Sequence, residues 1–326
     1  MNFHLEFTPK PFSTNILHQD KLFLLGSCFT ENIGSKLKQH KFKLVENPNG
    51  ILFNPISISK SINSYIGNKI YTDADLFYQN EVWNSWEHHS RFSHPDQQKS
   101  LDSINQSQSL AHQFVLEADW LLITVGSAFV YELQSGDVVA NCHKVPTDKF
   151  TKKLLTVDEV TRAFKQMLDN LLVINPSAKV IFTISPVRHL RDGFVENNRS
   201  KSTLVQAVHE VIACFNANTF YFPAYELVID DLRDYRFYTE DMVHPNHAAT
   251  NYVWEKFIAT CISESTQKLM KEINIINAAR LHKPFHPASE QHKKFLQTNL
   301  DKVDHLLKQF PYLDFEEEIA YFKAGV

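Results

Sequence analysis

The sequence is poor in glycine and cysteine and has no long apolar run. It has 326 residues, of which 8 are glycine and 4 are cysteine. The cysteines are far apart and lack the spacing of a zinc site or a disulfide framework, which indicates free thiols and a reducing compartment. No stretch approaches the roughly 18 apolar residues of a membrane span, and the first residues show no secretory signal pattern. We therefore expect a cytoplasmic protein with no membrane partner.

An excess of basic residues is also lacking. The formal net charge is -4, whereas binding to nucleic acid depends on a basic stripe or patch. This argues against a nucleic-acid partner, and no group of residues has the spacing of a metal site or calls for a cofactor. The oligomeric state stays open. Hydrophobic residues (43%) and charged residues (21%) are present in the ordinary balance of a globular protein.

Short apolar runs alternate along the chain with longer segments of helical periodicity. The runs that predict strands are Leu22–Leu25, Phe42–Val45, Trp120–Val125, Val180–Ile184 and Thr219–Phe222. The segments that predict helices lie near 29–40, 56–66, 157–173, 201–216 and 246–264. Runs that are apolar throughout are typical of a parallel sheet buried on both faces. The alternation therefore predicts a doubly wound α/β domain.

Two regions do not follow this alternation. Residues 71–114 include two tryptophans, two adjacent histidines and a polar segment. We interpret them as an insertion, part of which covers the sheet's edge as a lid. Residues 265–326 are helical and rich in Lys, Gln and Glu, and we expect an appended helical extension without a core of its own. The predicted organisation is an α/β domain over residues 1–264 followed by this extension.

Polar residues stand directly after several of the predicted strands. Ser27 follows the first run, Gly126 and Ser127 the third, and Arg188 and His189 the fourth. Ligands of open α/β sheets bind at the carboxyl ends of the strands. These residues are therefore expected to meet at one edge of the sheet.

Ser27 lies in LFLLGSCF, between a predicted strand and a predicted helix. A serine at that point is a preferred helix N-cap. It is also placed to attack a carbonyl if a base accepts its proton, because the helix N-terminus favours developing negative charge. The neighbouring Cys28 is a third possibility, since a helix N-terminus lowers the pKa of a thiol. Cysteine is, however, among the most frequently buried residues.

A base for Ser27 is offered by the segment DMVHP. Asp241 and His244 are three residues apart, so one turn can hold the carboxylate against the imidazole and stabilise the imidazolium. Pro245 then suits the first turn of a helix. An oxyanion needs amide donors, for which Ser27, Gly50, Gly126 and Ser127 are candidates. Either glycine also fits a plain turn.

Further basic residues are candidates for binding substrate. These candidates are His88, His89, His143, Lys144, Arg188 and His189. Adjacent histidines on a strand point in opposite directions, so at most one of the first two is expected to face a ligand. For His143, Lys144, Arg188 and His189 the alternative role is a polar network that holds loops together. We expect Asn197, Arg199 and Ser200 to cap the fourth helix.

The motifs together resemble those of a known family. GSCF, at Gly26–Phe29, resembles the signature of the GSCFA family, which is related to the SGNH/GDSL hydrolases. Further stretches similar to that family are NPNGILFNP, SWEHHSRF, VGSAFVYEL, NCHKVP, SPVRHLRDGFVENNRSKSTL and DMVHPNHAA. The resemblance covers roughly residues 20–260, in order, and much of the C-terminal region.

The resemblance implies a three-layer α/β/α, flavodoxin-like fold. It also implies that Ser27 is the nucleophile, that Asp241 and His244 complete a triad, and that Gly50 is an oxyanion donor. One departure concerns the third sequence block, where SGNH hydrolases have Gly-x-Asn-Asp and this chain has Gly126-Ser-Ala-Phe. Ser127 would then have to replace the asparagine.

The implied activity is that of a serine esterase or acyl hydrolase acting on an ester of a small molecule or a carbohydrate. Two alternatives remain open. One is acyl transfer to a sugar hydroxyl, which exclusion of water by the insertion would favour. The other is a binding protein that kept the fold but has weak chemistry, as the missing asparagine suggests.

Overall fold

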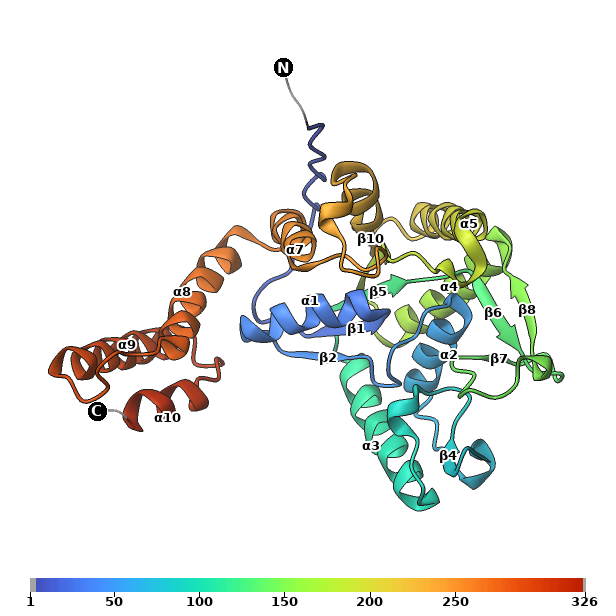
Figure 1. The fold of residues 1–326 in the computed structure, drawn as a ribbon, viewed down its shortest axis with the longest axis horizontal. Coiled ribbons are helices and arrows are strands. Elements are labelled where there is room, and N and C mark those ends of the chain that lie inside the picture. The colour runs from blue at the N-terminus through green and yellow to red at the C-terminus, as the bar shows by residue number, and fades with distance from the viewer. Residues whose placement is uncertain (1–3, 325–326) are drawn as a thin grey trace.

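The centre of the protein is a five-stranded parallel sheet (Figure 1). A computed structural model describes residues 4–324. The strands are β1 (Leu22–Gly26), β2 (Leu44–Glu46), β5 (Trp120–Val125), β9 (Lys179–Ile184) and β10 (Thr219–Tyr221). Their order is β2-β1-β5-β9-β10, and every neighbouring pair is parallel. This is the flavodoxin-like 2-1-3-4-5 order. The five predicted strands and their parallel pairing are confirmed.

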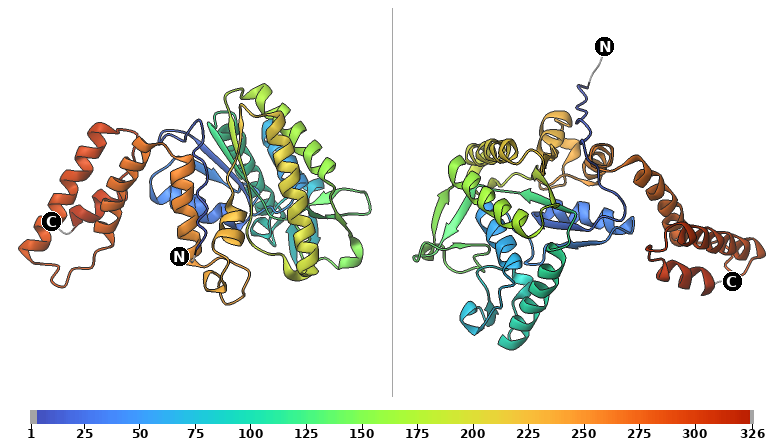
Figure 2. Two further views of the ribbon diagram at one scale, coloured as in Figure 1. Left: turned by 90° about the horizontal axis from the view of Figure 1, so that it is seen from above. Right: turned by 180° about the vertical axis from the view of Figure 1, so that it is seen from behind.

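Helices cover both faces of the sheet, which gives three layers (Figure 2). Leu22 and Leu24 of β1 face one layer, whereas Phe23 and Leu25 face the other. The first layer contains α1 (Cys28–Gln39) and α7 (His247–Cys261), together with the short α6 (Ala224–Glu226) and the π-helical turn after it. The second contains α2 (Pro55–Ile66), α4 (Val157–Ile174) and α5 (Gly193–Cys214).

The predicted insertion contains more regular structure than its polar composition indicates. A small hairpin of β3 (Phe77–Gln79) and β4 (Val82–Asn84) precedes the 19-residue helix α3 (Gln97–Val115). Ala111 and Val115 of this helix belong to the core against the sheet. The second half of the segment is therefore part of the helical layer, and a lid formed by another part of the insertion stays a prediction.

A second small sheet lies between β5 and α4. It consists of β6 (Phe129–Glu132), β7 (Val138–Val139) and β8 (Thr151–Leu154), in the antiparallel order β7-β6-β8. The sequence did not predict these strands, because they are short and mostly half-exposed. They carry the chain from the carboxyl end of β5 to the start of α4.

The C-terminal region consists of α8 (Glu264–Leu281), α9 (Glu290–Gln309) and α10 (Glu316–Ala324), which extend away from the sheet (Figure 2). These helices share a hydrophobic cluster of their own, contrary to the expectation of an extension without a core. They contact the α/β domain after α1, where Lys41 Nζ lies 2.9 Å from the Glu318 carboxylate. Across residues 4–324, no helix has the length and apolar character that a membrane crossing requires.

Candidate active site

Ser27 stands where β1 turns into α1, at the carboxyl edge of the sheet. The turn depends on Gly26, whose φ is 141° and whose N–H donates to Asn47 Oδ1 at 2.8 Å. A Cβ on Gly26 would lie 2.2 Å from the Thr124 carbonyl oxygen on the adjacent strand. Ser27 is the N-cap of α1, and its Oγ accepts a hydrogen bond from the Phe29 N–H at 3.4 Å. The predicted capping role is confirmed, and the side chain is buried.

Asp241 and His244 form a closely bonded pair in the loop before α7. His244 Nδ1 lies 2.5 Å from Asp241 Oδ2. The other carboxylate oxygen accepts the N–H groups of Val243 (2.9 Å) and His244 (3.0 Å) and the Thr239 hydroxyl (2.7 Å). These hydrogen bonds, above all that from the His244 N–H, hold the pKa of Asp241 well below its usual value. An ionised Asp241 keeps a proton on Nδ1 and leaves Nε2 as the basic nitrogen.

The serine and the histidine do not yet touch. Within residues 4–324, Ser27 Oγ and His244 Nε2 make no hydrogen bond with each other. Catalytic hydrogen bonds are often long or poorly aligned before substrate binds. The structure therefore shows an assembled Asp–His pair and a capped serine, and the complete triad remains a prediction.

The amides proposed for the oxyanion are engaged inside the protein. The Gly50 N–H donates to the Asn47 carbonyl at 2.7 Å. Gly126 and Ser127 both donate to the Phe53 carbonyl, at 2.8 and 3.0 Å. The Ser27 N–H donates to Thr124 at 3.3 Å, the longest of the four. In this conformation the first three amides are not available to an oxyanion.

The Ser127 hydroxyl is also occupied. It accepts the Phe129 N–H at 3.0 Å and lies 3.4 Å from Ser200 Oγ. Ser200 in turn accepts the Ala128 N–H at 2.8 Å. The serine that stands at the expected asparagine position is therefore part of the packing between the β5–β6 loop and α5.

Lys201 is a buried lysine that the sequence analysis missed. Its side chain is 2% exposed, and Nζ donates to the carbonyl groups of Gly126 (2.6 Å) and Ser185 (2.7 Å). These carbonyls follow β5 and β9. Burial lowers the Lys201 pKa to about 7, opposed by Cys28 and assisted by Arg188. A group that exchanges its proton near neutral pH thus lies among the strand ends that surround Ser27.

Helix α5 begins earlier than predicted, which changes the roles of its first residues. It starts at Gly193 instead of 201, so the prediction that Asn197, Arg199 and Ser200 cap it is wrong. The Asn197 side chain accepts the His189 N–H at 3.0 Å. Asn197, Ser200 and Lys201 extend the buried stripe of α5 toward its N-terminus by helical spacing. That spacing was the available sequence signal.

Arg188 and His189 are the predicted binding residues that lie beside the site. A Cβ on Gly126 would be 3.3 Å from His189 Nε2. The His189 pKa is lowered to about 4, mainly by burial, with smaller effects from Lys201 and His244. Arg188 Nη1 donates to the Tyr238 hydroxyl at 2.9 Å, close to the Asp241–His244 loop.

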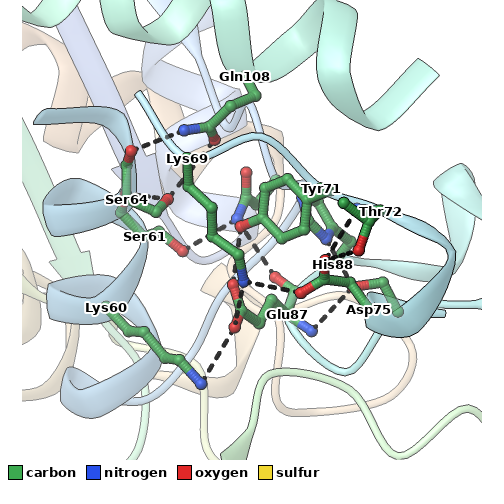
Figure 3. A network of polar contacts seen from close by, with 12 residues as sticks. Lys60, Ser61, Ser64, Lys69, Tyr71, Thr72, Asp75, Glu87, His88 and Gln108 are labelled. Atoms are coloured by element: carbon green, nitrogen blue, oxygen red, sulfur yellow. Dashed lines mark hydrogen bonds and ion pairs between the residues drawn. The ribbon is translucent and has the colours of Figure 1, made fainter. Parts of the chain in front are cut away.

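His88 belongs to a network of polar contacts that joins the insertion to α2 (Figure 3). Its Nδ1 lies 2.9 Å from Ser85 Oγ, and burial lowers its pKa to about 3. Beside it, Glu87 accepts the Tyr71 hydroxyl at 2.7 Å and pairs with Lys69 at 3.2 Å. In this placement His88 is part of the packing of these loops, and a side chain that is 1% exposed is not open to substrate.

Of the remaining basic candidates, His143 also holds a loop in place. His143 Nε2 lies 2.8 Å from the Ser85 carbonyl oxygen and is buried. Lys144 follows it in the same left-handed turn and is exposed. His89 packs on Gly50, where an added Cβ would be 2.1 Å from the His89 Cβ. Of the adjacent histidines, His89 is the one beside the predicted oxyanion segment.

The described chain is thus a three-layer α/β/α protein with a serine and an Asp–His pair among the loops around the carboxyl edge of its sheet. The sequence model of the GSCFA family matches residues 21–257, and that of the GSCFA domain protein, C-terminal domain, matches residues 273–326. The chain belongs to the GSCFA family.

Comparison with solved structures gives only weak likenesses. One, from Streptococcus pneumonia and described as a candidate platelet activating factor, is 11% identical, with a TM-score of 0.38 over 75% of this chain and 84% of that one. Another, an acetyl xylan esterase (Est2A) from the rumen bacterium Butyrivibrio proteoclasticus, is 11% identical, with a TM-score of 0.36 over 79% and 66%. Curated protein sequences give no match. At these scores neither likeness bears on activity.

Proposed function

We propose that this GSCFA protein is a serine acyl hydrolase of SGNH type that cleaves an ester of a small molecule or a carbohydrate. The observation that carries the proposal is the Asp241–His244 pair. Its carboxylate accepts four hydrogen bonds, including the 2.5 Å contact to His244 Nδ1. An orienting carboxylate with a fixed imidazole is the arrangement that a serine nucleophile needs.

In the proposed reaction, Ser27 Oγ attacks the acyl carbon while His244 Nε2 accepts the serine proton. Asp241 stabilises the imidazolium, which then gives the proton to the leaving alcohol. Water attacks the acyl-enzyme in the same way and releases the acid. The Ser27 N–H is the proposed oxyanion donor, because its bond to Thr124 is the longest of the four amide bonds.

The chemistry requires a local change at Ser27. Its Oγ accepts the Phe29 N–H, which leaves the hydroxyl proton to donate to His244 Nε2 once the two side chains approach each other. At 3.4 Å this capping bond is long, so its loss costs little of the roughly 1 kcal/mol of a good N-cap. The two roles of Ser27 are therefore compatible. It caps α1 in the free protein, and it attacks the ester when substrate is bound.

Ester hydrolysis by single-residue variants tests the proposal. With 4-nitrophenyl acetate, we expect Ser27→Ala and His244→Ala each to lower kcat by a factor on the order of 10³ or more. Cys28→Ala is the matched control on the adjacent residue, and we expect it to keep the wild-type rate. Loss of activity in Cys28→Ala with activity retained in Ser27→Ala would overturn the assignment.

The engaged amides favour a second candidate, a binding protein with the same fold. All four predicted oxyanion donors are bonded to carbonyl groups of the chain, and only the Ser27 bond, at 3.3 Å, is long. Such a protein would bind an ester without turnover, and equilibrium binding of the uncleaved ester by the wild type would identify it. Transfer to a sugar hydroxyl is distinguished from hydrolysis by analysing products with and without a carbohydrate acceptor.

The four free cysteines support the proposed cytoplasmic location.

A further inference from the structure

A cavity of about 550 Å³ lies beside the loop that carries Asp241 and His244. One wall is formed by Tyr238 and Met242, which stand on either side of Asp241 in that loop. Arg188 and Phe194, at the start of α5, also line the cavity. The volume is in the range of roughly 300–1,000 Å³ that small-molecule sites occupy.

The charge of the cavity wall is positive. Arg188 and Arg233 both line it, and among residues 4–324 neither forms an ion pair with a carboxylate. Arg188 donates to the Tyr238 hydroxyl, whereas Arg233 Nε donates to the Asp230 carbonyl. Asp234 is in the wall too, but its carboxylate is bonded to Arg236 at 2.7 Å. The two guanidinium groups therefore retain donors for an anion.

Large apolar side chains are exposed around the same cavity. Tyr235 is 73% exposed, Phe194 63% and Met242 52%. Apolar residues that cluster around a hollow mark binding sites more often than scattered ones do. In addition, Arg233 and Met242 have positive φ angles of 37° and 59°. Strained non-glycine residues of this kind cluster at functional sites.

We propose that this cavity receives a part of the ester substrate that combines an anionic group with a flat apolar face. Arg188 and Arg233 bind the anion, a carboxylate or a phosphate, through charge-assisted hydrogen bonds. Phe194 and Tyr235 cover the apolar face. The inference rests on the proposed function, because the anionic part of the substrate would lie next to the ester bond that is hydrolysed with His244 as the base.

The inference is tested with a charged ester and a neutral ester that differ only in whether the carboxylate carries a methyl group. We compare kcat/KM for 4-acetoxybenzoate and for its methyl ester, each divided by the rate of alkaline hydrolysis of that substrate. The wild type is expected to prefer the anion by about tenfold or more, the value of one or two hydrogen bonds to a charged group. Equal values for the two esters would overturn the inference.

Variants locate the preference. Arg188→Gln and Arg233→Gln are each expected to reduce the preference for the anion severalfold. Cleavage of the acetyl group from the neutral substrate should stay measurable in both variants. The matched control is Arg199→Gln, an exposed arginine of α5 that is paired with Glu196; neither residue lines this cavity. A preference that survives both cavity substitutions, or that is lost equally in Arg199→Gln, would contradict the assignment.

A binding measurement separates this inference from the proposed function. Calorimetry with Ser27→Ala uses 4-acetamidobenzoate, which resists hydrolysis, and 4-acetamidophenyl phosphate, which distinguishes the two anions. Binding that is weakened by adding Arg188→Gln or Arg233→Gln supports the cavity even if the wild type hydrolyses no ester. Hydrolysis without a charge preference or anion binding would leave the proposed function standing and overturn the inference.

Discussion

Gly26 fixes the position of Ser27 through its backbone alone. A side chain there would meet the Thr124 carbonyl at 2.2 Å, in addition to the strain of φ 141°. We therefore expect Gly26→Ala to lower the free energy of unfolding by about 4 kcal/mol or more, the range of severe backbone and packing changes. The measurement is chemical denaturation.

Gly136→Ala is the control for the conformational cost. Gly136 also has a positive φ, 87°, but an added Cβ there meets nothing within 4 Å. Gly136→Ala therefore measures only the cost of a positive φ, about 1–2 kcal/mol. The additional loss in Gly26→Ala is then due to the collision with Thr124. Equal losses in the two variants would show that Thr124 does not constrain the turn.

Lys201 is expected to make the free energy of unfolding rise with pH. Burial lowers its pKa from 10.5 to about 7 in the folded protein. Between these values the unfolded chain binds more protons than the folded one, so stability rises with pH. The free energy of unfolding of the wild type, relative to Lys201→Met, should increase by roughly 2–3 kcal/mol from pH 7 to pH 9.

The comparison uses denaturation curves at several pH values. Lys302→Met, at an exposed position of α9, is the control and should follow the wild-type dependence. If Lys201→Met also follows the wild type at every pH, the lysine does not change its protonation on folding in this range.

At the scale of secondary structure, the five strands of the central sheet were predictable, whereas the short outer strands, α3 and the start of α5 were not. The strands of the central sheet are continuous apolar runs, such as Trp120–Val125. Such a run can be identified from the sequence without knowledge of its tertiary contacts. Helix α3 was missed because its sequence is polar, with its few buried apolar residues spaced along 19 positions. The start of α5 was missed because Asn197, Ser200 and Lys201 occupy its buried face. Polar residues on a buried face have partners that only the tertiary structure supplies.

The same distinction applies to the candidate site. Ser27, Asp241 and His244 could be singled out from their positions after predicted strands and from the resemblance to the GSCFA family. The engagement of the Gly50, Gly126 and Ser127 amides is a property of loop conformation. No residue pattern encodes it, so the structure was needed to detect it.

The contact between α5 and the β5–β6 loop gives a prediction for one element. Ser200 Oγ accepts the buried Ala128 N–H at 2.8 Å. Ser200→Ala leaves that amide without its partner, and the expected loss is about 1–3 kcal/mol of unfolding free energy. Ser202→Ala, exposed on the same helix, should change it by less than about 0.5 kcal/mol. A Ser200→Ala protein as stable as the control would mean that water or another group satisfies the amide.

In the whole molecule, a small set of contacts holds the C-terminal helices against the α/β domain. The Glu318 carboxylate is 3% exposed and pairs with Lys41 at 2.9 Å and with Arg280 at 3.3 Å. Removing one member of a largely buried pair leaves the other charge without compensation. Glu318→Gln is therefore expected to loosen α10 and to increase the rate of limited proteolysis near residues 310–316.

The control for this contact is Glu317→Gln. Glu317 is 74% exposed and pairs only at the surface with Arg280, an interaction worth about 0–1 kcal/mol. Its proteolysis rate should match that of the wild type. Equal rates for Glu318→Gln and the wild type would show that the hydrophobic cluster of α8–α10 holds the helix without the ion pairs.

Mapping a covalent fluorophosphonate adduct tests the central claim most directly. The reagent modifies an activated serine, and peptide mass spectrometry then identifies the modified residue. We predict a single adduct on Ser27 that is absent in Ser27→Ala and forms at a strongly reduced rate in His244→Ala. An adduct on another residue, or one that persists in Ser27→Ala, would contradict the assignment of Ser27 as the nucleophile.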